Sequence, residues 1–142
     1  MKKTRIIMLL LLVYTSVYSI LACQPNVSIK TAQYAVNGQK LYGIHCQNCH
    51  GGKGEGLGKL YPPLTDQVFL KENKDRLACI IKYGSNQKLT VNGQVYETAM
   101  PAQQQLTDID IAYILTYITT RFGNETEAFE LEYIQKTLKN CP

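Results

Sequence analysis

The sequence of 142 residues has little of what a membrane-spanning or nucleic-acid-binding protein needs. The apolar run at residues 6–13 has eight residues, whereas a helix needs roughly 20 to cross a bilayer. Three of the 15 basic residues lie within the first five positions, which leaves 12 basic against 11 acidic residues in the rest of the chain. No basic stripe remains there that would favour a nucleic-acid partner. The sequence also has no internal repeats and no long low-complexity tracts.

The N-terminus has the pattern of an export signal. Basic residues at positions 2, 3 and 5 precede the apolar run, and Ala22 is a small residue before a candidate cleavage point. The residues from Ile20 to Cys23 resemble a bacterial lipobox, in which the cysteine becomes the lipidated first residue. We expect a signal peptide at residues 1–22 and a lipidated tether at 23–30, which would place the protein in the bacterial cell envelope, on the periplasmic side. Ordinary secretion and an uncleaved anchor are the alternatives.

The remaining chain is predicted to be mostly helical. Ser28 or Thr31 can cap a first helix that runs to about His45, and Thr107 with Asp110 forms a capping box at the start of the most regular helix. Asn92-Gly93 predicts a tight turn. The predicted fold class is therefore all-α. The further expected elements are a helical turn at 66–70, a helix at 73–83 that ends at Gly84, an exit from the capped helix at Gly123, and a final helix at 125–139.

The most informative motif is Cys46-Gln47-Asn48-Cys49-His50. Cys-x-x-Cys-His is the attachment signature of a c-type haem, in which two thiols bond the porphyrin and the histidine binds iron. Cys-x-x-Cys alone would also suit zinc or a redox dithiol. The added histidine and the export signal favour haem.

Several short motifs surround this one in a fixed order, and together they resemble a class I monohaem cytochrome c, including the cytochrome domains of oxidases and quinoprotein dehydrogenases. The resemblance implies three to five helices around one covalent haem c, with a cytochrome c domain at 31–123. It also implies that Gly38 packs against an aromatic residue, Tyr117. Residues 124–142 would be a helical extension packed on this domain. The motifs are Gly38-x-x-Leu41-Tyr42, Cys46-x-x-Cys49-His50-Gly51, Pro62-x-Leu64, Met100-Pro101 and 117–124.

The expected iron ligands follow from this resemblance and from the small number of methionines and histidines in the chain. Once the signal peptide is removed, Met100 is the sole methionine, and it precedes the last family helix, where the family has its second iron ligand. A core-filling role is the alternative for this side chain. His45 adjoins Cys46 on the same side of the ring as His50, so we do not expect it to bind iron.

Three further residues receive roles at this site. By resemblance, the carbonyl of Pro62, rather than that of Pro63, accepts the second ring N–H of His50, and Leu64 belongs to the same haem-binding motif. Tyr96 is expected to donate to a haem propionate or to stabilise the methionine loop, with an ordinary surface tyrosine as the alternative.

Cys79 and Cys141 are left over, and in an oxidising compartment a disulfide between them is the simplest account. Lys53 and Lys59 are expected near the exposed haem edge. There they either dock an acidic partner or belong to a solvated loop.

These expectations define an electron carrier rather than an enzyme. It would cycle one haem between Fe(III) and Fe(II), exchange electrons with membrane-bound redox proteins as donor and acceptor, and be attached to the membrane by lipid on Cys23. One alternative is a haem subunit of a larger respiratory or dehydrogenase complex, with the apolar face of the final helix as a docking surface. Another is a gas-sensing or peroxidatic haem protein, although no distal histidine or arginine pair supports it.

Overall fold

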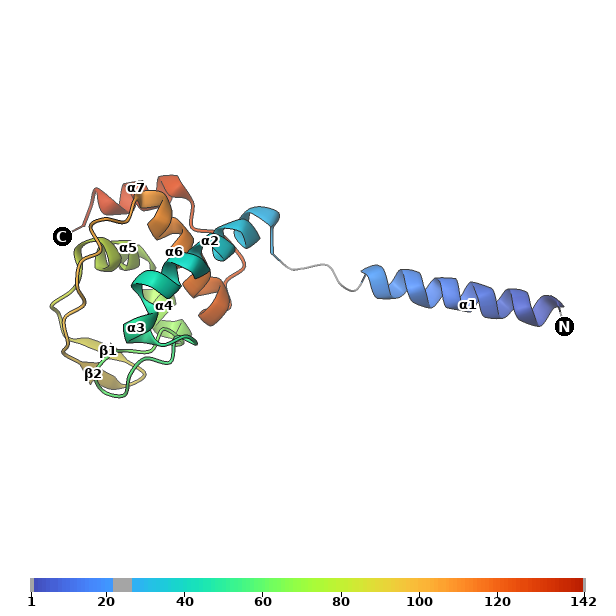
Figure 1. Cartoon of the computed structure of the whole chain (residues 1–142), viewed down its shortest axis with the longest axis horizontal. Coiled ribbons are helices and arrows are strands. Elements are labelled where there is room, and N and C mark those ends of the chain that lie inside the picture. The colour runs from blue at the N-terminus through green and yellow to red at the C-terminus, as the bar shows by residue number, and fades with distance from the viewer. Residues whose placement is uncertain (1, 22–26, 142) are drawn as a thin grey trace.

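The fold was taken from a computed structural model that describes residues 2–21 and 27–141 (Figure 1). Most of the described residues are helical and only two short strands occur, so the predicted all-α class is confirmed. The elements are α1 (Lys2–Leu21), α2 (Ile29–His45), α3 (Gln47–His50), α4 (Gln67–Glu72), α5 (Lys74–Tyr83), β1 (Leu89–Val91), β2 (Gln94–Tyr96), α6 (Asp108–Phe122) and α7 (Leu131–Leu138).

Helix α1 contains the basic and apolar residues of the expected signal peptide. Within residues 2–21 and 27–141, no helix is both long enough and apolar enough to cross a membrane. Cys23 and the rest of residues 22–26 lie outside the described residues, so the cleavage and lipidation of this segment stay predictions.

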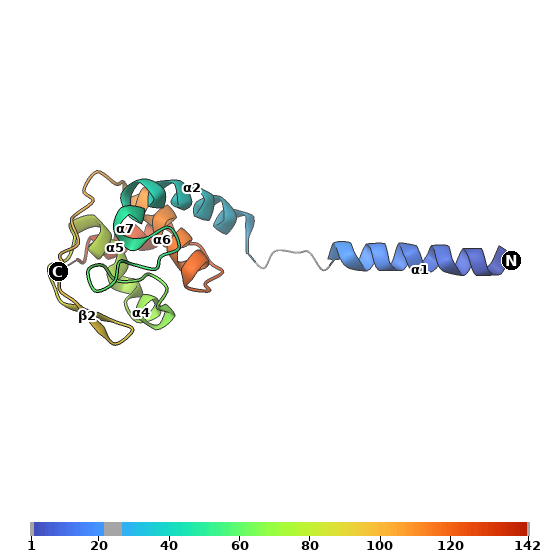
Figure 2. The same ribbon diagram turned by 60° about the horizontal axis from the view of Figure 1, so that its bottom comes forward.

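Helices α2 and α6 cross at the centre of the domain (Figures 1 and 2). Ser28, one of the two expected caps, accepts a hydrogen bond from the backbone N–H of Thr31 and starts α2. At the crossing, a β-carbon on Gly38 would lie 1.9 Å from the carbonyl oxygen of Tyr113 and 2.8 Å from Cβ of Tyr117. Gly38 therefore meets Tyr117 as expected, but the carbonyl of Tyr113 is closer.

Helix α6 supplies the largest part of the core. The predicted capping box is present, because Thr107 accepts from the N–H of Asp110 and the Asp110 carboxylate accepts from the N–H of Thr107. The apolar side chains of one face are almost entirely shielded from water, as the helical spacing requires. They are Ile111, Ile114, Leu115 and Ile118.

Helices α4 and α5 and the hairpin form the other side of the domain. Asp66 caps α4, and Gly84, at φ 77°, ends α5, so both predicted boundaries are present. Strands β1 and β2 pair antiparallel, and the turn between them has Asn92 at φ 50° and Gly93 at φ 72°. Two successive residues with positive φ are the geometry that an Asn-Gly hairpin adopts.

The prediction for the start of the final helix is wrong, because α7 starts at Leu131 and not near Glu125. The N–H of Glu125 donates to the carbonyl of Thr119, and the N–H of buried Phe129 donates to Oγ1 of Thr116. These bonds hold residues 125–129 along α6, so the final helix begins only at Leu131.

The apolar face of α7 does not form the suggested docking surface. Helix α7 packs against α5 and α6, and Ile134 is fully buried there, while Leu131 and Leu138 are half-buried. This face therefore belongs to the core of the domain.

Candidate haem site

The attachment motif lies at a break between two helices. Cys46 ends α2, and its N–H still donates to the carbonyl of Tyr42, while the N–H of His50 donates to the carbonyl of Cys46. Because α3 is a single helical turn, side chains three and four positions apart lie on the same side. Cys46, Cys49 and His50 therefore face one region, and both cysteines are free thiols.

His50 is held in a defined tautomer. Its side chain is 8% exposed, and Nδ1 lies 2.9 Å from the carbonyl oxygen of Pro62. A carbonyl can only accept, so Nδ1 carries the proton and Nε2 keeps a free lone pair. Burial lowers the pKa of His50, and the bond to Pro62 opposes this only in part. The ring is therefore neutral, which is the form that binds a metal.

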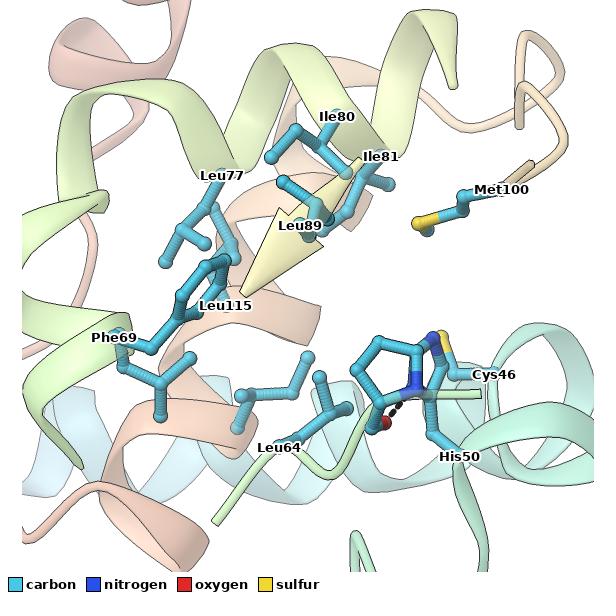
Figure 3. A pocket seen from close by; sticks show the side chains of 13 residues that line it. Cys46, His50, Leu64, Phe69, Leu77, Ile80, Ile81, Leu89, Met100 and Leu115 are labelled. Atoms are coloured by element: carbon cyan, nitrogen blue, oxygen red, sulfur yellow. Dashed lines mark hydrogen bonds between the residues drawn. The ribbon is translucent and has the colours of Figure 1, made fainter. Parts of the chain in front are cut away.

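An apolar cavity opens between His50 and Met100. Figure 3 shows these two side chains at opposite sides of it, with the apolar residues of α5 and β1 along one wall. Apart from His50, every side chain that lines the cavity is apolar, so the site suits a large hydrophobic ring. The lining residues are Cys46, His50, Pro62, Leu64, Phe69, Leu70, Leu77, Ile80, Ile81, Leu89, Met100, Leu115 and Ile118.

A second cavity adjoins the first, since both are lined by His50, Pro62, Leu89 and Met100. We call it the outer cavity because its lining also includes the exposed residues Gln87, Thr98 and Pro101. Cys46 lines only the inner cavity, whereas Cys49 lines only the outer one. A porphyrin bonded to both thiols would therefore contact both cavities. The donor set and the cavity lining fit a covalently attached haem.

Met100 is fixed by backbone contacts with the end of α5. Ser85 and Met100 form an isolated antiparallel bridge, with N–O distances of 3.0 and 2.8 Å. Gly84 lies so close that a β-carbon there would be 2.5 Å from the carbonyl oxygen of Met100.

The other candidate residues lie in different surroundings. Tyr96 is buried, lines the outer cavity and donates a 3.4 Å hydrogen bond to the carbonyl of Gly58, so it joins the hairpin to the glycine-rich loop at residues 51–59. His45 lines neither cavity, and its Nδ1 lies 3.5 Å from Nε2 of Gln105. Lys53 and Lys59 are exposed and also line neither cavity.

Tyr42 has a role that the sequence did not predict. Its hydroxyl donates a 2.6 Å hydrogen bond to the carbonyl of Gly51, next to His50, and its ring packs against Tyr117 and Phe122. Burial raises the pKa of Tyr42, which keeps the hydroxyl protonated as a donor. The motif around Gly38 includes this tyrosine, but nothing in its spacing indicates the partner.

Cys79 and Cys141 are joined by a disulfide that links α5 to the residues after α7. Their Cα atoms are 5.7 Å apart across a sequence separation of 62. The disulfide makes the C-terminal segment part of the structure that surrounds the cavity, since α5 lines it with Leu77, Ile80 and Ile81.

A helical domain with paired thiols, a neutral buried histidine and a methionine across an apolar cavity is typical of c-type haem proteins. Comparison with known proteins gives the same class. Residues 35–121 match the cytochrome c family. Cytochrome c-552 of Thermus thermophilus is 32% identical over 92 residues, which cover 62% of this chain and 70% of that protein.

The fructose dehydrogenase cytochrome subunit of Gluconobacter japonicus is 32% identical over 117 residues. This match covers 77% of the present chain but 23% of that subunit. The chain belongs to the cytochrome c family, as a class I c-type cytochrome. It is therefore an electron-transfer protein with covalently bound haem c, and the size of the domain fits one haem.

Proposed function

We propose that the chain is a single-haem electron carrier in which Cys46 and Cys49 attach the haem and His50 and Met100 bind its iron from opposite sides. The observation that carries this proposal is the placement of Met100 across the apolar cavity from a histidine whose Nδ1–H is held by Pro62 (Figure 3). When bound, the haem supplies a one-electron change between Fe(III) and Fe(II).

The residues of the chain determine how this electron moves. The apolar wall excludes water from the iron, and a neutral thioether from Met100 favours Fe(II) relative to a second histidine. If His50 and Met100 both bound the iron, it would have no open site for a substrate. The outer cavity, which Cys49, Tyr61 and Tyr96 line, leads toward the surface and gives partners access to one side of the ring.

A spectrum of Met100→Ala beside that of wild type tests the ligand assignment. We expect low-spin wild-type protein with the weak red band of Fe(III)–Met, and a variant that loses this band and binds carbon monoxide rapidly when ferrous. His45→Ala removes the only other histidine and should keep the wild-type spectrum. A high-spin ferric spectrum in wild type would contradict the assignment of Met100 as an iron ligand.

A gas-sensing or peroxidatic function receives no support from the residues that line the two cavities. They include no arginine and no histidine besides His50. Rapid binding of carbon monoxide to ferrous wild type would favour that function instead.

We further propose that the mature protein begins at Cys23 and is anchored by lipid to the periplasmic side of the membrane, where its redox partners are membrane-bound. The signal pattern supports this location. Labelled fatty acid should be incorporated into wild type but not into Cys23→Ala, and the variant should move to the soluble fraction. Gln24→Ala is the matched control and should stay with the membrane. Wild type without label would contradict lipidation.

A second candidate is a cytochrome subunit within a dehydrogenase complex, which the match to the fructose dehydrogenase cytochrome subunit supports. Detergent extracts of membranes that contain the tagged chain would decide between the two. A stoichiometric dehydrogenase partner would favour the complex. A monodisperse single chain that exchanges electrons with several partners would favour the free carrier.

A further inference from the structure

The position of Met100 depends on α5 through contacts at the end of that helix. The two bonds between Ser85 and Met100 pair their backbones, and Gly84 lies directly against the Met100 carbonyl. Ser85 follows Gly84, the C-cap residue that ends α5, so a displacement of the helix end moves Met100 with it.

The loop after Met100 is attached to the same helix. The N–H of Gln103 donates to the carbonyl of Ile81 at 3.0 Å. Nζ of Lys82 donates to the carbonyls of Gln104 and Leu106 at 3.1 and 2.5 Å. The end of α5 and the residues that follow it thus hold the methionine loop at Met100 and at residues 103–106.

Helix α5 is in turn supported from outside by the C-terminal segment. One face of α5 lines the haem cavity with Leu77, Ile80 and Ile81. On another side, the disulfide joins Cys79 to Cys141, and the hydroxyl of Tyr133 donates to the carboxylate of Asp75. These two links lie near the middle and at the first turn of α5.

The support comes from a part of the chain beyond the family match, which ends at residue 121, whereas Cys141 is 20 residues further on. Cys79 is also only five residues before Gly84, within two turns of the Met100 contact. The covalent link is therefore placed where it restrains the end of the helix that carries the methionine loop.

We propose that Cys79 and Cys141 are positioning residues for the bond between Met100 and the iron. The disulfide restrains the outward movement of α5 that would withdraw the thioether from the cavity. This inference rests on the proposed role of Met100 as an iron ligand.

The test compares the haem-loaded Cys79→Ser/Cys141→Ser protein with wild type. In the variant, we expect a weaker red Fe(III)–Met band and a lower midpoint potential than in wild type. Carbon monoxide should bind the ferrous variant about tenfold faster, which is a typical size for the coupling between two sites. A loss of stability alone would leave the spectrum of the folded protein unchanged. The control is Tyr34→Ala, which removes an edge contact of α2 with Tyr113 on α6 and so destabilises the domain away from α5.

A second measurement avoids any dependence on the folding of the variant. Wild type is treated with a phosphine and water, which convert the disulfide to two thiols as the phosphine becomes its oxide. Carbon monoxide binding should then accelerate, and reoxidation of the thiols should restore the slow rate. Rescue by reoxidation separates the effect from irreversible damage.

The outcomes distinguish the two proposals. Wild type without an Fe(III)–Met band contradicts the ligand assignment. Wild type with that band, together with a disulfide-free protein whose band and carbon monoxide rate are unchanged, overturns the role of the disulfide. Equal acceleration in Tyr34→Ala also overturns it, because the effect would then follow general destabilisation.

Discussion

Gly38 is the residue where the approach of α2 to α6 is closest. An alanine there would place its methyl carbon 1.9 Å from the carbonyl oxygen of Tyr113, which belongs to a rigid helix and cannot turn aside. We expect Gly38→Ala to lower the free energy of unfolding by about 2 kcal/mol or more, since overpacking typically costs about 1–3 kcal/mol and exceeds the gain in helix propensity. Denaturant unfolding of the haem-loaded protein measures this difference.

Gly43 provides the matched control in the same helix. A β-carbon there meets only the side-chain oxygen of Gln47, at 3.8 Å, which is ordinary contact. Gly43→Ala should raise the free energy of unfolding by about 0.5–1 kcal/mol, because glycine is unfavourable inside a helix. If both substitutions changed the free energy of unfolding in the same direction, the close packing of α2 on α6 would not explain the glycine at position 38.

At the level of single residues, the sequence was most informative where the chemistry is local. Cys46, Cys49 and His50 are neighbours in the chain, so one turn of helix brings them together whatever the rest of the fold does. The approach of Gly38 to α6 could also be expected, from the cost of a glycine inside a helix. The hydrogen bond from Tyr42 to Gly51 could not, because it depends on the turn that α3 makes after α2.

At the level of elements, Asp66 connects α4 to the hairpin. Its Oδ1 accepts from the N–H groups of Val68 and Phe69, and its Oδ2 accepts from the N–H of Asn92 at 2.9 Å. We expect Asp66→Ala to cost about 1 kcal/mol, as the loss of an N-cap usually does. Asp66→Asn keeps a capping oxygen and should cost less. Thermal unfolding of the two variants beside wild type checks this order.

The same carboxylate predicts a dependence of stability on pH. Hydrogen bonds from the N–H groups of Phe69, Asn92 and Val68 lower the pKa of Asp66 below its usual 3.8. Its charged form is therefore stabilised in the folded protein. The contribution is present above pH 3.8 and is lost as the pH falls below that value through the lower folded pKa. The difference in unfolding free energy between wild type and Asp66→Asn should shrink over this acidic range, and a difference that grew on acidification would contradict the assignment.

Most helices could be predicted because their caps and their apolar spacing lie within a few residues of one another. Thr107 with Asp110 marks a helix start without reference to the rest of the chain. The start of α7 could not be predicted, since Thr116 holds Phe129 by a bond between residues 13 positions apart. Leu89 was also missed as a cavity residue, because a strand of three residues is too short to show an alternation.

At the level of the whole molecule, the cavity combines residues that are far apart in the sequence. Its wall includes Leu64, Leu77, Leu89 and Leu115, which come from a loop, α5, β1 and α6. The sequence could identify the two proposed iron ligands, one from the attachment motif and the other as the sole methionine outside the expected signal peptide. It could not identify the apolar residues of the cavity wall, because a contact between distant segments leaves no local pattern. The disulfide could be expected only because two cysteines were left over.

The lining of the outer cavity includes no lysine, arginine, aspartate or glutamate side chain. If the proposed signal is removed, the remaining chain has 12 basic and 11 acidic residues. With two haem propionates, its net charge would be close to −1. Two copies that meet at the outer cavity should therefore repel each other only weakly.

Electron self-exchange between ferric and ferrous copies tests this whole-molecule charge balance. Because screening acts on charge, the rate in wild type should change by less than about threefold between roughly 10 and 200 mM salt. Lys53→Glu/Lys59→Glu makes the net charge four units more negative at exposed positions on the glycine-rich loop. Its rate should be lower at low salt and rise steeply with added salt. Line broadening in nuclear magnetic resonance spectra of mixed oxidation states measures both rates. A wild-type rate as salt-dependent as that of the variant would show that copies meet through a charged surface instead.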